Sequence, residues 1–151
     1  MNENEIRKIV DDIFSPEKMT FNKLLGFKIN LDDINNPKII MKMNGNLVGN
    51  YYFKILHGGA ISSILDTVGG VVAMISVLKK FEGNIEELPE KLSKISTVDL
   101  RVDYLRPGKG EFFIATAHVI RAGNKVCVNR MELRNDISDL VAVGTGTYLV
   151  G

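Results

Sequence analysis

The chain of 151 residues is long enough for one domain with a sizeable core. Its composition, 45% hydrophobic and 25% charged, is typical of a soluble globular protein, and a formal net charge of +1 gives no overall field that would attract nucleic acid. The single cysteine, Cys127, excludes an internal disulfide and fits a reducing compartment. The first residues, MNENEIRKIVDD, lack the order of a signal peptide, so we expect a cytoplasmic protein.

Two short helices are predicted at the N-terminus. Residues 4–14 carry isoleucine and valine at helical spacing. Ser15 followed by Pro16 is typical of a helix start, and Gly26 can end that second helix. We therefore expect residues 1–25 to form a helical extension of a single domain that covers the whole chain.

Two strands and one long apolar helix follow. Residues 27–32 and 38–44 have strand character, and a helix is predicted over about 58–80. This helix is long enough to cross a membrane, but Asp66 lies near its middle and strands surround it. A helix that is apolar on all sides is also typical of a core, so we expect no membrane span.

The last third of the chain contains four strand-like runs after a polar connection, FEGNIEELPEKL. In the first run, SKISTVDLRVDYL, strict alternation places Val98, Leu100, Val102 and Tyr104 on one face. The other three runs are separated by short turns, which favours an antiparallel meander. The element order predicts an α+β fold, in which one strongly curved antiparallel sheet of five or six strands covers the long helix.

Four segments of the chain resemble the hotdog-fold acyl-CoA thioesterases. They are NYYFKILHGGAISSILDTVGG, STVDLRVDYLRPGKGE, RAGNKVCVNRMEL and LVAVGTGTYL. Within that superfamily they are similar to the phenylacetate-operon and thioesterase-superfamily-member group, and above all to a bacterial branch that favours medium to long acyl chains. The resemblance covers roughly residues 24–150 and does not include the helix over 4–14.

The resemblance implies a set of site residues. Asn50, His57 and Gly58 would form the carbonyl-binding side, Asp66 would be the general base or the nucleophile, and Thr97 would orient a water molecule. It also implies dimers with active sites at the interface, often paired into tetramers. As alternatives from the residues themselves, Asn50 is also typical of a turn, and Thr97 is an ordinary strand residue.

Thioester chemistry gives a reason for these residue types. Negative charge develops on the carbonyl oxygen, and the N–H groups at a helix start can stabilise it. Gly58 allows close approach to such an N–H group, which makes it the expected oxyanion donor. His57 either contacts the carbonyl or supports the loop.

The spacing of His57 and Asp66 predicts a composite site. Nine residues separate them, which on one helix corresponds to a turn of about 900° and a rise of roughly 13 Å. The two side chains then lie on opposite faces and cannot easily reach one thioester carbon. Two antiparallel helices of a symmetric homodimer can bring them together.

Several other residues have expected roles. Two basic turns are candidates for binding the phosphates of coenzyme A, one with Arg106 and Lys109 and the other with Arg121 and Lys125. The two histidines of the chain have no metal-ligand spacing, so we expect no metal, and no cofactor other than the coenzyme A of the substrate. The aromatic run Tyr51–Phe53, with Leu56, would line either an acyl tunnel or a dimer interface.

The sequence therefore predicts a homodimeric or tetrameric acyl-CoA thioesterase, which hydrolyses an acyl-CoA to a carboxylic acid and free coenzyme A. One alternative is a non-catalytic hotdog module that binds acyl-CoA or lipid. Another is a hotdog dehydratase that acts on hydroxyacyl thioesters. The sequence does not decide the acyl chain length.

Overall fold

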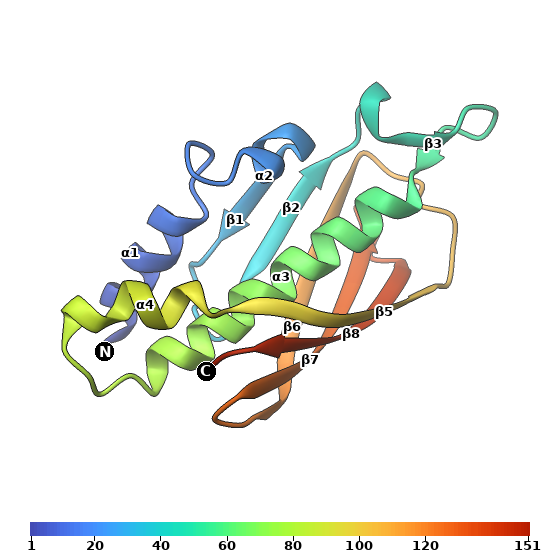
Figure 1. Cartoon of the computed structure of the whole chain (residues 1–151). Coiled ribbons are helices and arrows are strands. Elements are labelled where there is room, and N and C mark those ends of the chain that lie inside the picture. Colours follow the sequence, from blue (N-terminus) through green and yellow to red (C-terminus); the bar gives the residue numbers. More distant parts are fainter.

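The computed structural model describes residues 1–151, and its main feature is a curved sheet around one long helix (Figure 1). The helix α3 spans Gly58–Lys79. The six strands pair antiparallel in the order β1-β2-β6-β7-β8-β5. They are β1 (Phe27–Asn30), β2 (Lys38–Lys42), β5 (Ser96–Tyr104), β6 (Phe112–Ala122), β7 (Val126–Asn135) and β8 (Leu140–Leu149). This arrangement confirms the expected α+β hotdog fold.

Helix α3 forms the centre of the core. Ile64, Leu65 and Val68 are fully buried between the helix and the sheet. By length and composition alone α3 could cross a membrane, but 67% of its most apolar stretch of 18 residues is buried inside the protein. The burial favours the core helix over the membrane span, because the curved sheet covers the apolar faces that a bilayer would otherwise have to cover.

The N-terminal helix α1 (Glu3–Ile13) packs onto this core. Asn2 and Glu5 form a capping box that satisfies the first N–H groups of the helix. Ile6 and Val10, one turn apart, are buried at 1% and 0% exposure in the same cluster as α3. Helix α1 is therefore fixed to the domain and is not a loose extension.

The second helix begins later than predicted. Helix α2 spans Thr20–Leu25 and ends at Gly26, whose left-handed φ of 71° suits glycine. The predicted start at Ser15 is wrong: the Ser15 carbonyl accepts hydrogen bonds from the N–H groups of Lys18 and Met19. These bonds close a single turn after α1, and the chain leaves that turn before the helix begins.

The polar connection after α3 contains more structure than expected. It forms a short 3₁₀ helix, η2 (Ile85–Glu87), and the helix α4 (Leu88–Ser93). Leu88 is only 5% exposed and Leu92 packs against the core. The abundance of charged residues in this segment concealed these apolar contacts.

A small two-stranded sheet lies just before α3. A 3₁₀ helix, η1 (Gly45–Leu47), leads into β3 (Val48–Asn50), which pairs with β4 (Ile55–Leu56). The His57 N–H donates to the Leu47 carbonyl at 2.8 Å. This hairpin therefore holds the start of α3 in place.

A bulge in β5 changes which side chains face α3. The ladder with β8 shifts between Thr97 and Asp99, which leaves Val98 as an extra residue. Strict alternation placed Val98 on the same face as Leu100, but Val98 is 63% exposed. Thr97 takes the place on the helix side instead, because the extra residue inverts the alternation at this point.

Candidate active site

Asp66 lies in the middle of α3 and is held by hydrogen bonds from two strands. Thr97 on β5 donates its hydroxyl to Asp66 Oδ1 at 2.9 Å. Tyr148 on β8 donates its hydroxyl to the Asp66 carbonyl at 3.1 Å, and lies 3.3 Å from Oδ1. The carboxylate is half-buried, so it is oriented by the protein and still accessible.

Tyr148 was not identified from the sequence, although a signal was present. Alternation along β8 places Gly144, Gly146 and Tyr148 on one face, which leaves an aromatic side chain beside two positions without side chains. Burial raises the pKa of Tyr148, and the nearby Asp66 carboxylate raises it further. The hydroxyl therefore stays protonated and remains a hydrogen-bond donor.

The Tyr148 hydroxyl fits against the backbone of α3 at Gly69. A Cβ atom on Gly69 would lie 2.0 Å from the Tyr148 hydroxyl oxygen, a distance that no real contact shows. The buried Asn129 amide donates to the Gly69 carbonyl at 2.7 Å and fixes this part of the helix. Glycine at this position is what allows Tyr148 to reach Asp66.

The start of α3 presents a free N–H group. His57 caps the helix, and its Nδ1 accepts from the Gly59 N–H at 2.8 Å. The N–H groups of Ala60 and Ile61 donate to the His57 carbonyl. The N–H of Gly58 is the one group of this turn that takes part in none of these bonds. Because Nδ1 is an acceptor, the proton of a neutral His57 lies on Nε2, which is then also a free donor.

Two further contacts shape this end of the helix. Tyr104, at the end of β5, donates its hydroxyl to the Gly58 carbonyl at 3.0 Å. Asn50 Oδ1 accepts from the Phe53 N–H at 3.2 Å, as in the turn interpretation of this residue. The Asn50 amide nitrogen makes no hydrogen bond within the chain.

The predicted site residues therefore form two separate groups within one protomer. Asp66 and Thr97 form one group, and Asn50, His57 and Gly58 lie together at the start of α3. Eight residues of helix separate Gly58 from Asp66, which corresponds to about 12 Å. No hydrogen bond joins the two groups.

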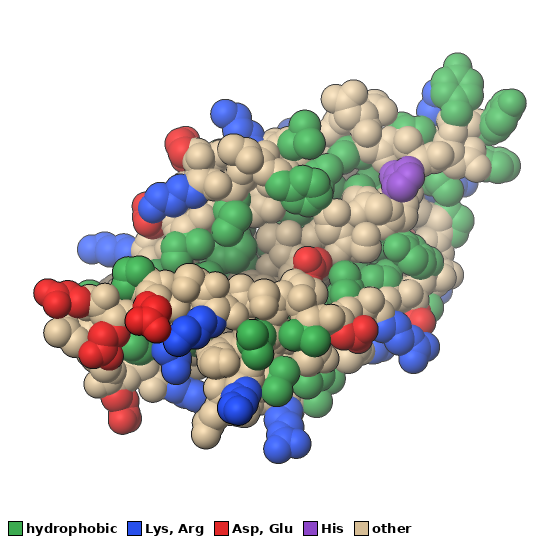
Figure 2. All heavy atoms as spheres, in the orientation of Figure 1, with side chains coloured by type: hydrophobic (Ala, Val, Ile, Leu, Met, Phe, Trp, Pro, Cys, Tyr) green, Lys and Arg blue, Asp and Glu red, His purple; other side chains and the backbone are tan.

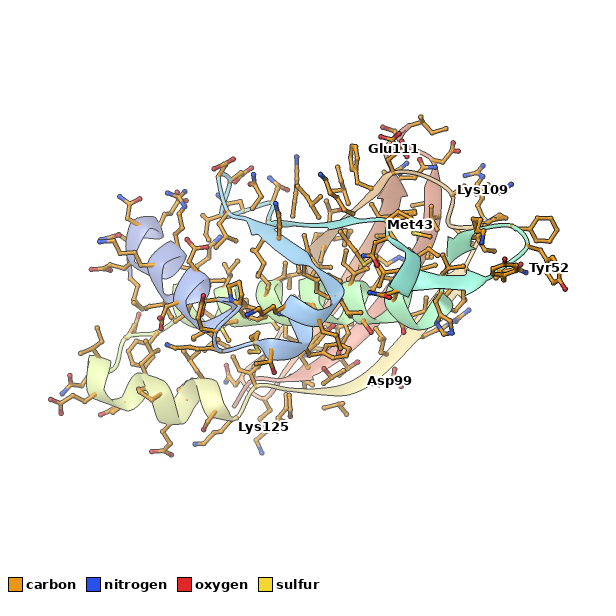
Figure 3. The ribbon with its side chains drawn as sticks, turned by 90° about the horizontal axis from the view of Figure 1, so that it is seen from above. Met43, Tyr52, Asp99, Lys109, Glu111 and Lys125 are labelled. Atoms are coloured by element: carbon orange, nitrogen blue, oxygen red, sulfur yellow. The ribbon has the colours of Figure 1, made fainter.

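The two basic turns lie at opposite ends of α3. The turn with Arg106 and Lys109 is held beside the helix start, where the Leu56 N–H donates to the Gly108 carbonyl at 2.9 Å. The turn between β6 and β7 is held at the other end by a bond of 2.9 Å from Lys80 Nζ to the Ala122 carbonyl. Figure 3 shows Lys109 and Lys125 at these opposite ends.

The aromatic run after Asn50 does not line an internal cavity in this protomer. Tyr51, Tyr52 and Phe53 are 74%, 89% and 66% exposed. They form the tip of the loop between β3 and β4, and Figure 3 shows Tyr52 projecting away from the domain. Leu56, by contrast, is buried in the core.

An apolar cleft of about 750 Å³ opens beside the Asp66 group. Figure 2 shows the hollow between the N-terminal segment and α4, with hydrophobic side chains around it. Thr97 and Tyr148 line the cleft, as do Gly70 and Met74 of α3. The volume lies within the range of about 300–1,000 Å³ that is usual for small-molecule sites.

The chain has no cluster of metal ligands: no group of three or more His, Cys, Asp or Glu side chains could hold an ion. Cys127 is buried and donates to Asn129 Oδ1 at 3.2 Å, so it belongs to the core. Burial raises the pKa of the Cys127 thiol, which keeps it protonated and unreactive.

Comparisons with known proteins give four consistent matches. Residues 53–142 match the thioesterase superfamily. The chain is 44% identical over 145 residues to the medium/long-chain acyl-CoA thioesterase YigI of Escherichia coli, which covers 95% of this chain and 93% of the relative. It is 26% identical over 133 residues to human acyl-coenzyme A thioesterase 13, and the match covers 87% of this chain and 85% of that relative. A crystal structure from Shewanella oneidensis, described as related to the thioesterase superfamily, superposes with a TM-score of 0.92 at 43% identity and covers 99% of this chain and 97% of that one.

Proposed function

Because the chain belongs to the thioesterase superfamily, as its HGG and VDYLRP segments predicted, we propose that it hydrolyses medium- to long-chain acyl-CoA thioesters. The products are a carboxylic acid and free coenzyme A. The observation that carries this proposal is the Asp66 carboxylate, which is oriented by Thr97 and Tyr148, two side chains that line an apolar cleft. The identity with YigI supports the choice of substrate class.

Asp66 is the proposed catalytic group. As a general base it takes a proton from a water molecule, which attacks the thioester carbon. Thr97 uses its hydrogen for Asp66, so its oxygen is free to accept a hydrogen bond from that water. Direct attack by the carboxylate, followed by hydrolysis of the anhydride, is the alternative route.

The Gly58 N–H is the proposed oxyanion donor. It lies at the positive end of the α3 dipole and has no partner in the helix cap, so it can bind the negative oxygen of the tetrahedral intermediate. His57 Nε2 and the Asn50 amide can support the same oxygen. Collapse of the intermediate then releases the coenzyme A thiolate, which takes a proton from the active site.

The two groups meet in a homodimer, which is the second part of the proposal. Strand β5 is at the edge of the sheet, so one row of its backbone groups is unpaired. Exposed apolar side chains of Val98, Tyr104 and Leu105 lie on or next to this edge. Pairing of β5 with its two-fold copy would bring the start of one α3 to the Asp66 of the other, and two such dimers can form a tetramer.

Thiol release from acyl-CoAs of increasing chain length tests the catalytic proposal. We expect turnover in the wild-type protein and its loss in Asp66→Asn, which keeps the shape of the side chain. Asp11→Asn, an exposed carboxylate on α1, is the matched control. Binding of acyl-CoA without thiol release from any protein would favour the binding module, and release of an enoyl product without thiol would favour the dehydratase.

Mixing two inactive variants tests the composite site. Gly58→Pro removes the N–H group, and proline is tolerated at the first position of a helix. The preceding residue, His57, already has the extended φ and ψ that a residue before proline requires. In a heterodimer of Gly58→Pro and Asp66→Asn, one site carries both changes and the other carries neither. After random exchange of subunits we expect about a quarter of the wild-type activity. A site within one protomer would recover none.

We further propose that the basic turns bind the phosphates of coenzyme A. Arg106 and Lys109 are both exposed beside the start of α3, and Arg121 and Lys125 are both exposed on the hairpin at its other end. Replacing both basic residues of the turn that binds the phosphates by alanine should raise KM for an acyl-CoA and leave KM for the matching acyl-pantetheine unchanged.

The reaction needs no cofactor beyond the substrate, so activity should survive dialysis against EDTA. A cytoplasmic location fits a chain whose cysteine is a free thiol.

A further inference from the structure

The geometry points to the cleft beside Asp66 as the acyl-chain site, with a depth set by the N-terminal helix α1 and by Met74. This inference rests on the proposed function and goes beyond it, because it assigns the acyl chain to a pocket within one protomer. It also gives a role in substrate selection to α1, which lies outside the region that matches the family.

The cleft lies beside the catalytic carboxylate. Asp66, Gly70 and Met74 are spaced four residues apart, so they lie on one face of α3. Thr97 and Tyr148, the two side chains that hold Asp66, also line the cleft. A chain attached to a carbonyl at Asp66 can therefore run along α3 toward its C-terminal half.

The far walls come from α1 and from the segment after α3. Ile9 and Ile13 of α1 face the cleft, beside the buried pair that fixes this helix to the core. Leu88 and Leu92 of α4 form the opposite wall. Arg7 donates to the Leu31 carbonyl at 2.9 Å and anchors α1 further, so this wall is preformed.

The charge of the lining fits an alkyl chain. Among the residues around the cleft only Asp12 and Lys18 are charged, and they pair with each other at the rim. An unpaired charge would favour a polar ligand, but none faces the interior. The exposed aromatic run Tyr51–Phe53 contributes nothing to this lining.

Substitutions at Met74 test the inference in two directions. Met74→Phe should shorten the cleft and Met74→Ala should deepen it. Each methylene that loses its apolar contact costs about fourfold in kcat/KM, so exclusion of two or three methylenes gives roughly a tenfold or larger fall for long chains relative to short ones. Ile13→Phe should act in the same direction as Met74→Phe. The control is Ile120→Phe, which adds the same ring on an exposed position of β6.

The measurements are kcat/KM for straight-chain acyl-CoAs from four to sixteen carbons, and calorimetric binding of the same compounds to the Asp66→Asn forms. Opposite shifts of the preferred length in Met74→Phe and Met74→Ala, with Ile120→Phe unchanged, would support the site. Unchanged length profiles in stably folded Met74 and Ile13 variants would overturn it. Binding that shifts with length, without thiol release from the wild type, would uphold the cleft and defeat the thioesterase proposal.

Discussion

Thr97 and Tyr148 face each other across the β5–β8 ladder, and both hydroxyl groups reach Asp66 on the helix that the sheet covers. These two residues, which face each other on neighbouring strands, therefore orient the Asp66 carboxylate together. The pair depends on the bulge at Val98, because without the extra residue Thr97 would face away from α3.

Thr97→Val should lower kcat strongly, because valine keeps the shape of the side chain but can neither hold Asp66 nor accept a hydrogen bond from water. Thr97→Ser keeps the hydroxyl and should retain most of the activity. Steady-state kinetics of both variants on one acyl-CoA would decide. Equal activity of the valine and serine variants would contradict a role for the hydroxyl.

Tyr148→Phe should reduce kcat by about tenfold to a hundredfold, since a hydrogen bond to a charged group contributes about 1.5–3 kcal/mol. Tyr51→Phe, on an exposed ring, serves as the control. An unchanged kcat in Tyr148→Phe would contradict a role for the hydroxyl group.

Gly69→Ala should destabilise the protein and loosen Asp66, because the new methyl group would overlap the Tyr148 hydroxyl. Overpacking of this kind costs about 1–3 kcal/mol. Gly70→Ala is the matched control: a Cβ atom there comes no closer than 3.9 Å to Tyr148, and alanine is the better helix former. Urea unfolding of the two variants should differ in midpoint, and a similar midpoint for both would show that Tyr148 can move at no cost.

Stability should fall at alkaline pH. Burial raises the pKa of Cys127 above its ordinary value of 9.0 and that of Tyr148 above its ordinary value of 10.0. The folded state therefore keeps protons that the unfolded state releases, so the free energy of unfolding is unaffected below about pH 9 and decreases above it. Urea unfolding from pH 8 to 11 measures this slope. Cys127→Ala and Tyr148→Phe should each make it shallower, whereas Tyr51→Phe should leave it as it is.

His57→Ala should lower the free energy of unfolding by about 1 kcal/mol through loss of the α3 cap. Asparagine is a good N-cap residue, so His57→Asn should recover that stability. The rates of the two variants then separate the roles of the side chain. Activity that returns with asparagine would assign His57 to the cap alone, and activity that stays low would assign its Nε2 proton to the substrate.

The patterning of the chain was enough to predict the strand order along the sequence, the buried helix and the proximity of the last three strands. It also drew attention to Asp66, a lone carboxylate on an apolar helix. The Val98 bulge and the pairing of Tyr148 with Thr97 were not predicted, because both depend on the register between β5 and β8, which no local signal sets. The short helix α4 was missed for a different reason: its charged residues dominate the segment, and only Leu88 and Leu92 meet the core.

Helix α1, which contributes to the choice of acyl chain, lies far along the chain from the residues that cleave the thioester. The carboxylate, the helix cap and the bulged strand all lie within residues 53–142, whereas α1 ends at Ile13. Substitutions on one face of this first helix can therefore alter which fatty acids are released without disturbing the residues that cleave the thioester. Related chains with the same chemistry could in this way divide a mixed pool of acyl-CoAs among themselves.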